Sequence, residues 1–172
     1  MKSDLVDKIL EQWQRERPDL DASPMSVIGR MARLAKHLDR SIQGTVSEFG
    51  LNLGEFDVLA TLLRSGHPYQ LSPTDLFNAL MVSSGTMTHR IDRLERAELV
   101  KRIPDPSDRR GTLIALTDKG LSLIEQAIEA HVANAHHILS VLEESECESL
   151  TLLLRKLLLS FEPQPPRISR PR

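Results

Sequence analysis

The sequence predicts a mainly α-helical protein with one small β-hairpin. Apolar side chains recur at helical spacing over most of the chain, and only residues 99–116 depart from this pattern. That region consists of two short β-prone runs on either side of a turn rich in Pro, Asp and Gly. With 172 residues, of which 40% are hydrophobic and 27% charged, the chain has the length and balance of one globular domain.

Two helices are expected in the N-terminal part of the chain. Ser3 can cap the first, because one face of the following residues is apolar. That face consists of Val6, Ile9, Leu10 and Trp13. Pro18 and Pro24 interrupt the helical pattern, and a long second helix with one apolar stripe follows over residues 25–48 until Gly50 ends it.

Three shorter helices are expected next. The helix over residues 55–64 is apolar on nearly every side and should therefore lie at the centre of the fold. Ser72 as N-cap and Pro73 at the first helical position predict a helix that ends near Leu80. The helix over residues 84–97 has a narrow apolar seam and a polar face. The seam is Met87, Ile91 and Leu94, and the polar face carries Gly85, Thr86, His89, Asp92, Arg93 and Arg96.

A short helix, an amphipathic helix and a hairpin in this order form the layout of a winged helix-turn-helix, expected over residues 54–117. In that fold the amphipathic helix enters the major groove of DNA and the hairpin tip reaches a neighbouring minor groove. Arg109 and Arg110 stand in the predicted turn, and a narrow minor groove attracts arginine. By composition alone, a solvated helix followed by an ordinary turn explains this region as well as a DNA-binding helix and wing do.

Two helices with large apolar faces are expected after the hairpin. Thr117 caps a helix over residues 118–142 whose stripe repeats every 3.5 residues or so, and a capping box from Ser145 to Glu148 starts the last helix. The last helix has a broad apolar face of Leu150, Leu153, Leu154, Leu157, Leu158 and Phe161. The tail over residues 163–172 is rich in Pro and Arg and is expected to be disordered.

Composition excludes several classes of protein. The chain has 22 Lys and Arg against 24 Asp and Glu, and a net charge of −2 argues against coating nucleic acid by bulk charge. A single cysteine, Cys147, excludes an intramolecular disulfide. No secretory signal and no membrane span is apparent, so we expect a cytoplasmic protein without a membrane partner. No nucleotide-binding, metalloprotease or hydrolase motif is present, and we expect no enzyme, no catalytic residue, no cofactor and no metal site.

The fifth helix and the hairpin resemble a known family. The segments SSGTMTHRIDRLERAELVKR and DPSDRRGTLIALTDKG are similar to the recognition helix and wing of the MarR family of bacterial regulators, and the similarity extends over residues 25–161. It implies a homodimer on a pseudo-palindromic DNA site, with a dimerisation lobe built from residues 3–49 and 118–162. It also implies that Ser84, Thr86, Thr88 and His89 face bases or nearby phosphates, that Arg109 and Arg110 serve the minor groove, and that Asp108 braces the wing arginine.

A narrower resemblance lies further upstream. The segment QWQRERPDLD followed by PMSVIGR is similar to the urate-responsive, PecS-like branch of that family. The resemblance implies a ligand site of Trp13, Asp57, Arg90 and Arg102, and a small planar anion such as urate as effector. A ring to stack on, two guanidinium groups and one carboxylate suit such an anion. Each residue alone also has another explanation. Trp13 could be a packing anchor and Asp57 could form a local hydrogen bond. Arg90 could form an ion pair and Arg102 could contact a phosphate.

Other effectors stay open as alternatives. Relatives in the family sense other aromatic or phenolic ligands, zinc or oxidants. His131, His136 and His137 lie on one predicted helix, but their spacing does not place two imidazoles on one face as a zinc site requires. Cys147 lies between Glu146 and Glu148, and neighbouring acidic side chains reduce the reactivity of a thiol. A pure dimerisation module would not explain two arginines at a hairpin tip.

Overall fold

The computed structural model describes residues 3–81, 83–108 and 110–162. The chain divides into two compact units, one ending at Asn134 and the other beginning at Ala135, and each is described by itself. The tail that was expected to be disordered lies outside the described residues, as does Arg109.

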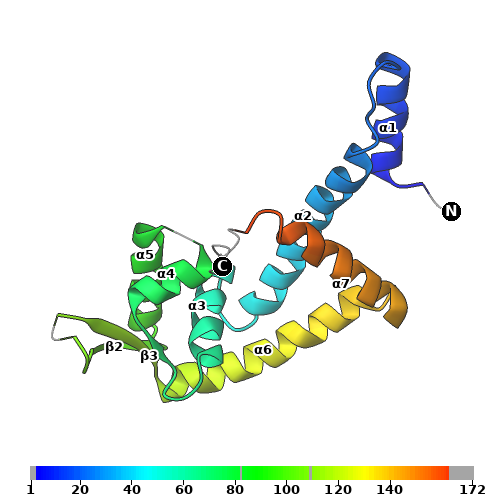
Figure 1. Ribbon diagram of the computed structural model, residues 1–172. Helices are drawn as coiled ribbons and strands as arrows, with labels where there is room; N and C mark the ends of the chain where they lie inside the picture. The colour runs from blue at the N-terminus through cyan, green and yellow to red at the C-terminus, as the bar shows by residue number, and fades with distance from the viewer. Residues whose placement is uncertain (1–2, 82, 109, 163–172) are drawn as a thin grey trace, which may run out of the picture. The chain divides into compact units, whose positions relative to one another are not determined.

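The first unit contains the five helices expected before the hairpin (Figure 1). They are α1 (Leu5–Glu16), α2 (Met25–Ser47), α3 (Leu53–Arg64), α4 (Pro73–Leu80) and α5 (Ser84–Arg96). The expected cap of α4 is confirmed, because the Ser72 hydroxyl accepts a hydrogen bond from the Asp75 backbone at 3.1 Å. The expected cap of α1 is wrong by one residue. Asp4, not Ser3, accepts from the backbone N–H of Val6 at 2.7 Å and of Asp7 at 3.0 Å, because its carboxylate lies directly before the first turn.

The predicted hairpin is present and is part of a three-stranded antiparallel sheet. The hairpin strands are β2 (Val100–Pro104) and β3 (Thr112–Leu116), and β3 lies between β2 and a two-residue strand, β1 (Gln70–Leu71). β1 pairs only with Ala115 and Ile114 of β3. The sequence pattern did not predict β1, because two residues are too few to show a periodicity. The outer half of the hairpin therefore has no third strand beside it.

The core of the first unit lies around α3, as the sequence predicted. Phe56, Val58, Leu59 and Leu62 of this helix are at most 5% exposed, and Val58, Leu59 and Leu62 are fully buried. The seam of α5 packs on the same core with Met87, Ile91 and Leu94, each 1–2% exposed. Burial of this seam turns the polar face of α5 outward.

Two helices follow the sheet. α6 (Asp118–Leu139) is capped by Thr117 as expected, since the Thr117 hydroxyl accepts from the Gly120 backbone at 3.0 Å. The second unit contains the end of α6 and α7 (Glu144–Leu158). The cap of α7 is Glu143 rather than Ser145, and the Glu146 carboxylate accepts from the Glu143 backbone N–H at 2.9 Å. The capping box thus starts two residues earlier than the sequence suggested.

Large apolar side chains remain exposed in both units. On and after α7 they are Leu150, Leu152, Leu153, Leu154, Leu157, Leu158, Leu159 and Phe161, between 37% and 84% exposed. On α1, α2 and the segment between them they are Leu5, Trp13, Leu20, Met25, Val27, Ile28, Met31 and Leu34, between 38% and 61% exposed. Faces of this extent in water are typical of surfaces that bind another protein.

Candidate functional site

The outer face of α5 presents the helix residues that were predicted to meet DNA. The Ser83 hydroxyl caps the helix by accepting from the Thr86 backbone at 3.3 Å. Ser84, Thr86, Thr88 and His89 are all exposed. The placement allows each of them to meet a partner outside the chain.

These side chains differ in whether they already form hydrogen bonds within the chain. The hydroxyls of Thr86 and Ser83 lie 2.9 Å apart, and the Thr88 hydroxyl donates to the Ser84 carbonyl at 3.0 Å. His89 makes no side-chain hydrogen bond within the described part of the chain, so both ring nitrogens are available. It is therefore the most adaptable hydrogen-bonding group of these four.

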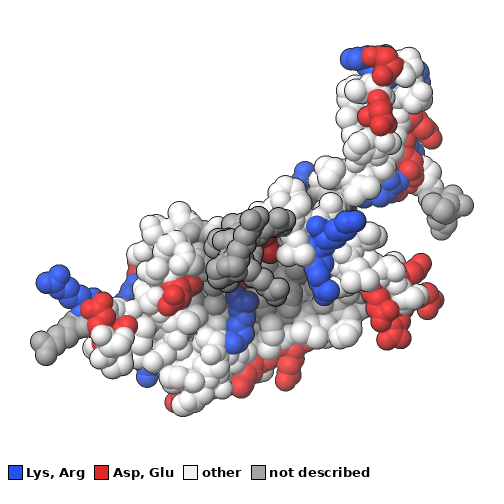
Figure 2. Space-filling model, in the orientation of Figure 1, with Lys and Arg blue, Asp and Glu red and all other residues white. Residues whose placement is uncertain are grey.

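The turn between β2 and β3 is shaped by two aspartates. The Asp105 carboxylate accepts from the Ser107 hydroxyl at 2.6 Å and from the Ser107 backbone at 2.8 Å, and the hydroxyl bond lowers the pKa of Asp105. The Asp108 carboxylate accepts from the backbone N–H of Arg110 at 2.9 Å. Asp108 thus holds the backbone at Arg110, and the Arg110 side chain is exposed. In this region, at the left of Figure 2, basic and acidic side chains lie next to one another.

Arg102 of β2 is bound to α5. Its Nη2 lies 2.6 Å from an Asp92 carboxylate oxygen, and its Nη1 contacts Glu95. The hydrogen bond to Asp92 raises the pKa of Arg102, and Glu95 contributes to the same shift. Asp92 and Glu95 are two and five residues after Arg90, so they point about 160° and 140° away from Arg90 around the helix. The structure therefore does not bring Arg102 to the face of α5 that carries Arg90.

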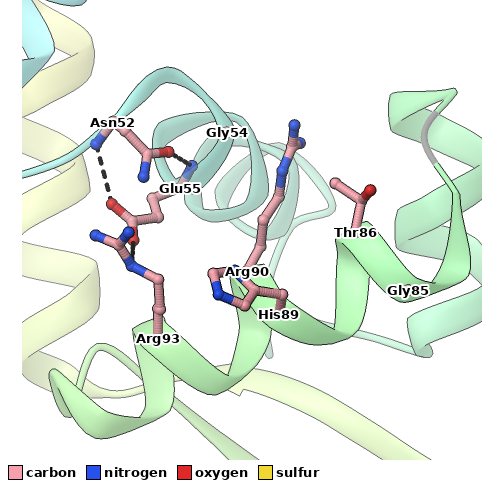
Figure 3. Close-up of a pocket in the computed structure, with 8 residues that line it drawn as sticks. All are labelled: Asn52, Gly54, Glu55, Gly85, Thr86, His89, Arg90 and Arg93. Carbon is pink, nitrogen blue, oxygen red and sulfur yellow. Dashed lines mark hydrogen bonds and ion pairs between the residues drawn. The ribbon is translucent and has the colours of Figure 1, made fainter.

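A groove of about 460 Å³ lies between the start of α3 and the outer face of α5 (Figure 3). Its lining residues are Asn52, Gly54, Glu55, Gly85, Thr86, His89, Arg90 and Arg93. Glu55 is only 4% exposed. It accepts from the Asn52 backbone at 3.0 Å and pairs with Nε of Arg93 at 2.7 Å. The pairing ties the first turn of α3 to the last turn of α5.

Arg90 packs directly over Gly54 on one wall of this groove. A Cβ atom at Gly54 would lie 2.5 Å from Nε and 2.6 Å from Cζ of Arg90, so only glycine leaves room for the guanidinium. Nη1 of Arg90 is buried and has no hydrogen-bond partner among the described residues. A buried guanidinium nitrogen without an acceptor is costly and is suited to binding an anion.

Asp57 of α3 does not line this groove, but its carboxylate is near enough to Arg90 for their charges to interact. Burial raises the pKa of its carboxyl, and the positive charges of Arg90, His131 and Arg64 oppose that rise. His131 reaches this region from α6, with its ring centroid 5.1 Å from that of Phe56, and its Nδ1 is buried without a partner. The charges of Arg90 and His131 thus both act on Asp57, and the sequence did not suggest His131 as part of this site.

Trp13 lies in another part of the first unit. α1 packs on the N-terminal half of α2, where Arg30 bonds to Asp4 at 2.8 Å. α3 meets the other end, where the Leu53 backbone donates to Gln43 at 3.2 Å. Arg30 and Gln43 are 13 residues apart, about 20 Å along a helix. Within one chain, Trp13 is therefore separated from Asp57 and Arg90; its side chain is 38% exposed.

The alternative sites receive no support from geometry. Over residues 3–81, 83–108 and 110–162, no group of three or more His, Cys, Asp or Glu side chains is arranged to hold a metal ion. His136 and His137 are exposed, and Cys147 is a partly exposed free thiol on α7. None of the helices described in these ranges combines the length and apolarity needed to cross a membrane.

Comparisons with known proteins agree with this architecture. The model of the MarR family matches residues 51–112. The chain is 45% identical to the HTH-type transcriptional regulator PecS of Dickeya dadantii (strain 3937), over 88% of this chain and 92% of that protein. This chain belongs to the MarR family. It is also 31% identical to the HTH-type transcriptional regulator MhqR of Bacillus subtilis (strain 168), over 74% of this chain and 86% of that protein.

Solved structures of MarR-family proteins share the fold. A mutant of MarR from E. coli complexed with operator DNA is 26% identical to this chain, with a TM-score of 0.68, and the match covers 91% of this chain and 99% of that chain. AbsC, a MarR-family regulator from Streptomyces coelicolor, is 25% identical with a TM-score of 0.74, over 82% of this chain and 95% of that chain. Mostly helical architecture with a small antiparallel sheet is thus shared within the family.

Sequence reasoning missed the contacts that organise the groove. Glu55, Asn52 and Gly54 were not predicted as site residues. The pattern Asn-x-x-Glu at Asn52 and Glu55 is a recognisable capping box and could have indicated the start of α3. The ion pair of Glu55 with Arg93 and the packing of Arg90 on Gly54 join different helices, and no local pattern in the sequence indicates them.

Proposed function

We propose that this chain is a ligand-responsive transcriptional regulator that binds operator DNA as a homodimer. The observation that carries the DNA-binding part is the combination of an exposed polar face on α5 with a hairpin whose tip carries an exposed Arg110. Membership of the MarR family and the operator-bound structure of a relative support the same function.

In this proposal α5 lies in the major groove. Ser84, Thr86, Thr88 and His89 then meet base edges or nearby phosphates. The hairpin places Arg110 at an adjacent minor groove, and Arg109 is proposed to serve the same groove. Asp108 contributes by holding the backbone of the turn at Arg110.

The homodimer is supported by the exposed apolar faces. α7 has no buried residue among those described, and it exposes several leucines along its length. A second copy of the chain presents the same faces, so a two-fold axis can bury both at once. Two equivalent α5 helices would then read a pseudo-palindromic operator with half-sites about one helical turn apart.

The observation that carries the effector part is the buried, unpaired Nη1 of Arg90 beside the half-buried Asp57. We propose that a planar anion of the urate type enters here and accepts hydrogen bonds from Arg90. Because Arg90 belongs to α5, drawing its side chain toward the anion acts directly on the helix that reads DNA. The effector would therefore lower operator affinity, to the extent that it binds the protein with Arg90 drawn inward more tightly than the DNA-binding conformation.

Trp13 is proposed as the stacking surface for the anion. Since it lies beyond the reach of Asp57 and Arg90 of its own chain, the partner's Trp13 would complete the pocket in the dimer. Arg102, which was also predicted as a ligand residue, would have to leave both Asp92 and Glu95 to take part. The pocket proposed here therefore rests on Asp57, Arg90 and Trp13.

Binding to DNA from upstream of the protein's own gene tests the proposal. We expect specific, salt-sensitive binding that urate reverses, and quenching of the sole tryptophan by urate. Trp13→Ala should retain DNA binding and lose the urate response, whereas Trp13→Phe should keep part of it because it retains an aromatic face. Urate that neither quenches Trp13 nor releases DNA at millimolar concentration would refute the effector proposal. Xanthine and salicylate serve as comparison ligands.

A further inference from the structure

We propose that Arg102 is a positioning residue that locks the wing to the DNA-reading helix α5. The inference rests on the proposed DNA-binding function, and it gives Arg102 a role different from the ligand contact that the family resemblance implied. It follows from where the Arg102 guanidinium is bound and from where the hairpin lacks other support.

Arg102 makes three links from β2 to α5. Its Nη2 bonds to Asp92 at 2.6 Å, its Nη1 contacts Glu95, and its backbone N–H donates to Glu95 at 3.3 Å. Asp92 and Glu95 are three residues apart and therefore neighbours on one face of the helix. A planar guanidinium held by two carboxylates has a defined orientation, which a single ion pair would not provide.

The position of Arg102 in the sheet makes this link important. Arg102 pairs with Ile114 of β3. Of the β3 residues that also pair with β1, Ile114 is the one nearest the hairpin tip. Beyond this point the hairpin consists of two strands only, and two-stranded hairpins are marginally stable in water. No side chain further along the described part of the hairpin bonds to α5. Among the described residues, Arg102 therefore makes the outermost side-chain hydrogen bonds and ion pairs between the wing and α5.

Arg102 could also assist DNA binding in a simpler way, by neutralising two carboxylates near the phosphates. The two roles differ in their effect on Arg110. A lock sets where the hairpin tip lies and so determines whether Arg110 reaches its groove. Neutralisation changes the overall attraction to DNA and leaves the contribution of Arg110 as it was. Ion pairs as exposed as these add little to the global free energy of unfolding, so global unfolding would not separate the two roles.

A double-mutant cycle between Arg102 and Arg110 separates them, with operator affinity measured at one salt concentration. We expect Arg110→Ala to weaken binding by roughly 5- to 140-fold in the unaltered chain. In the Arg102→Ala background the same change should cost less than about threefold, because the unlocked wing no longer holds Arg110 in place. Arg102→Lys keeps the charge without the planar fork and should restore the coupling only in part.

Lys101→Ala provides the matched control. Lys101 is the adjacent exposed cation on β2 and makes no ion pair among the described residues. Lys101→Ala removes the same charge as Arg102→Ala, and its effect on operator affinity should add to that of Arg110→Ala. Additive effects of Arg102→Ala and Arg110→Ala would overturn the proposal.

Hydrogen exchange of the free protein gives a second test that needs no DNA. Arg102→Ala should speed exchange of the outer hairpin amides, such as that of Ile103, and Lys101→Ala should not. Unchanged exchange in Arg102→Ala would refute the lock, whatever the result for DNA binding. If Arg110→Ala leaves DNA binding unchanged, the proposed function fails, and the exchange measurement still tests the lock. Loss of the urate response in Arg102→Ala with unchanged hairpin exchange would show that Arg102 is a ligand residue after all.

Discussion

Replacing Gly54 by alanine should separate folding from effector binding. Gly54 is the second residue of α3, and the Arg90 guanidinium occupies the space of its missing Cβ, with Nε at 2.5 Å, Cζ at 2.6 Å and Nη2 at 2.9 Å from the position of that atom. Since ordinary contact begins at 3.4 Å, Nε must move by about 0.9 Å or more.

The expected effect on stability is small. The clash involves the end of a flexible side chain, and Nη1 of Arg90 has no hydrogen bond to lose. Alanine is favoured over glycine inside helices by about 1 kcal/mol, which offsets the displacement. We therefore expect the free energy of unfolding to change by less than about 1 kcal/mol.

The expected effect on effector binding is large. A hydrogen bond to a charged group contributes about 1.5–3 kcal/mol, so misplacing Arg90 should weaken urate binding by roughly 10- to 140-fold. Quenching of Trp13 measures the affinity, and thermal unfolding measures the stability.

Gly44→Ala is the control for this experiment. Gly44 lies inside α2, and a Cβ there would meet nothing within 4 Å. The substitution should stabilise the protein by up to about 1 kcal/mol and leave urate affinity unchanged. If Gly54→Ala binds urate as tightly as the unaltered chain, the assignment of Arg90 to the pocket is wrong. If Gly54→Ala instead lowers the free energy of unfolding by much more than about 1 kcal/mol, the Arg90 side chain cannot move out of the way.

Four further results are expected. Arg110→Ala should weaken specific operator binding by about 1–3 kcal/mol at fixed salt while the helix content stays the same; unchanged affinity would remove the wing from the interface. Leu154→Glu with Leu158→Glu should abolish the dimer and DNA binding, because each buried leucine contributes about 1.5–3 kcal/mol and symmetry counts each twice; a well-folded monomer of the unaltered chain at micromolar concentration would contradict this. Burial raises the pKa of Asp57, so its charged form destabilises the folded state above the ordinary pKa and this penalty fades as the pH falls through the raised pKa. Asp57→Asn should therefore raise the melting temperature at pH 7, with an advantage that shrinks toward about pH 4. Gly120→Ala should destabilise the protein by about 1–3 kcal/mol or more, since a Cβ there would overlap a backbone carbonyl oxygen, and a melting temperature equal to that of the unaltered chain would contradict this.

Local features of the fold could be predicted from the sequence because they depend on residues a few positions apart. Ser72 and Thr117 cap their helices as predicted, since a short hydroxyl side chain reaches only the next turn. The two caps that were predicted wrongly, Ser3 and Ser145, each had an acidic side chain within two residues that can cap equally well. The choice between such neighbours depends on small differences in backbone geometry that composition does not reveal.

By itself the sequence determined the mainly helical fold with its hairpin, the buried seam of α5 and the exposure of its polar face. Periodicity carries this information, because a helix must bury its apolar side to be stable. Only the tertiary structure decided the partners of the charged groups: Arg102 with Asp92 and Glu95, and Arg90 over Gly54 beside Asp57. Long side chains such as arginine can reach any of several carboxylates, and which one they meet depends on how helices and strands from distant parts of the chain pack together.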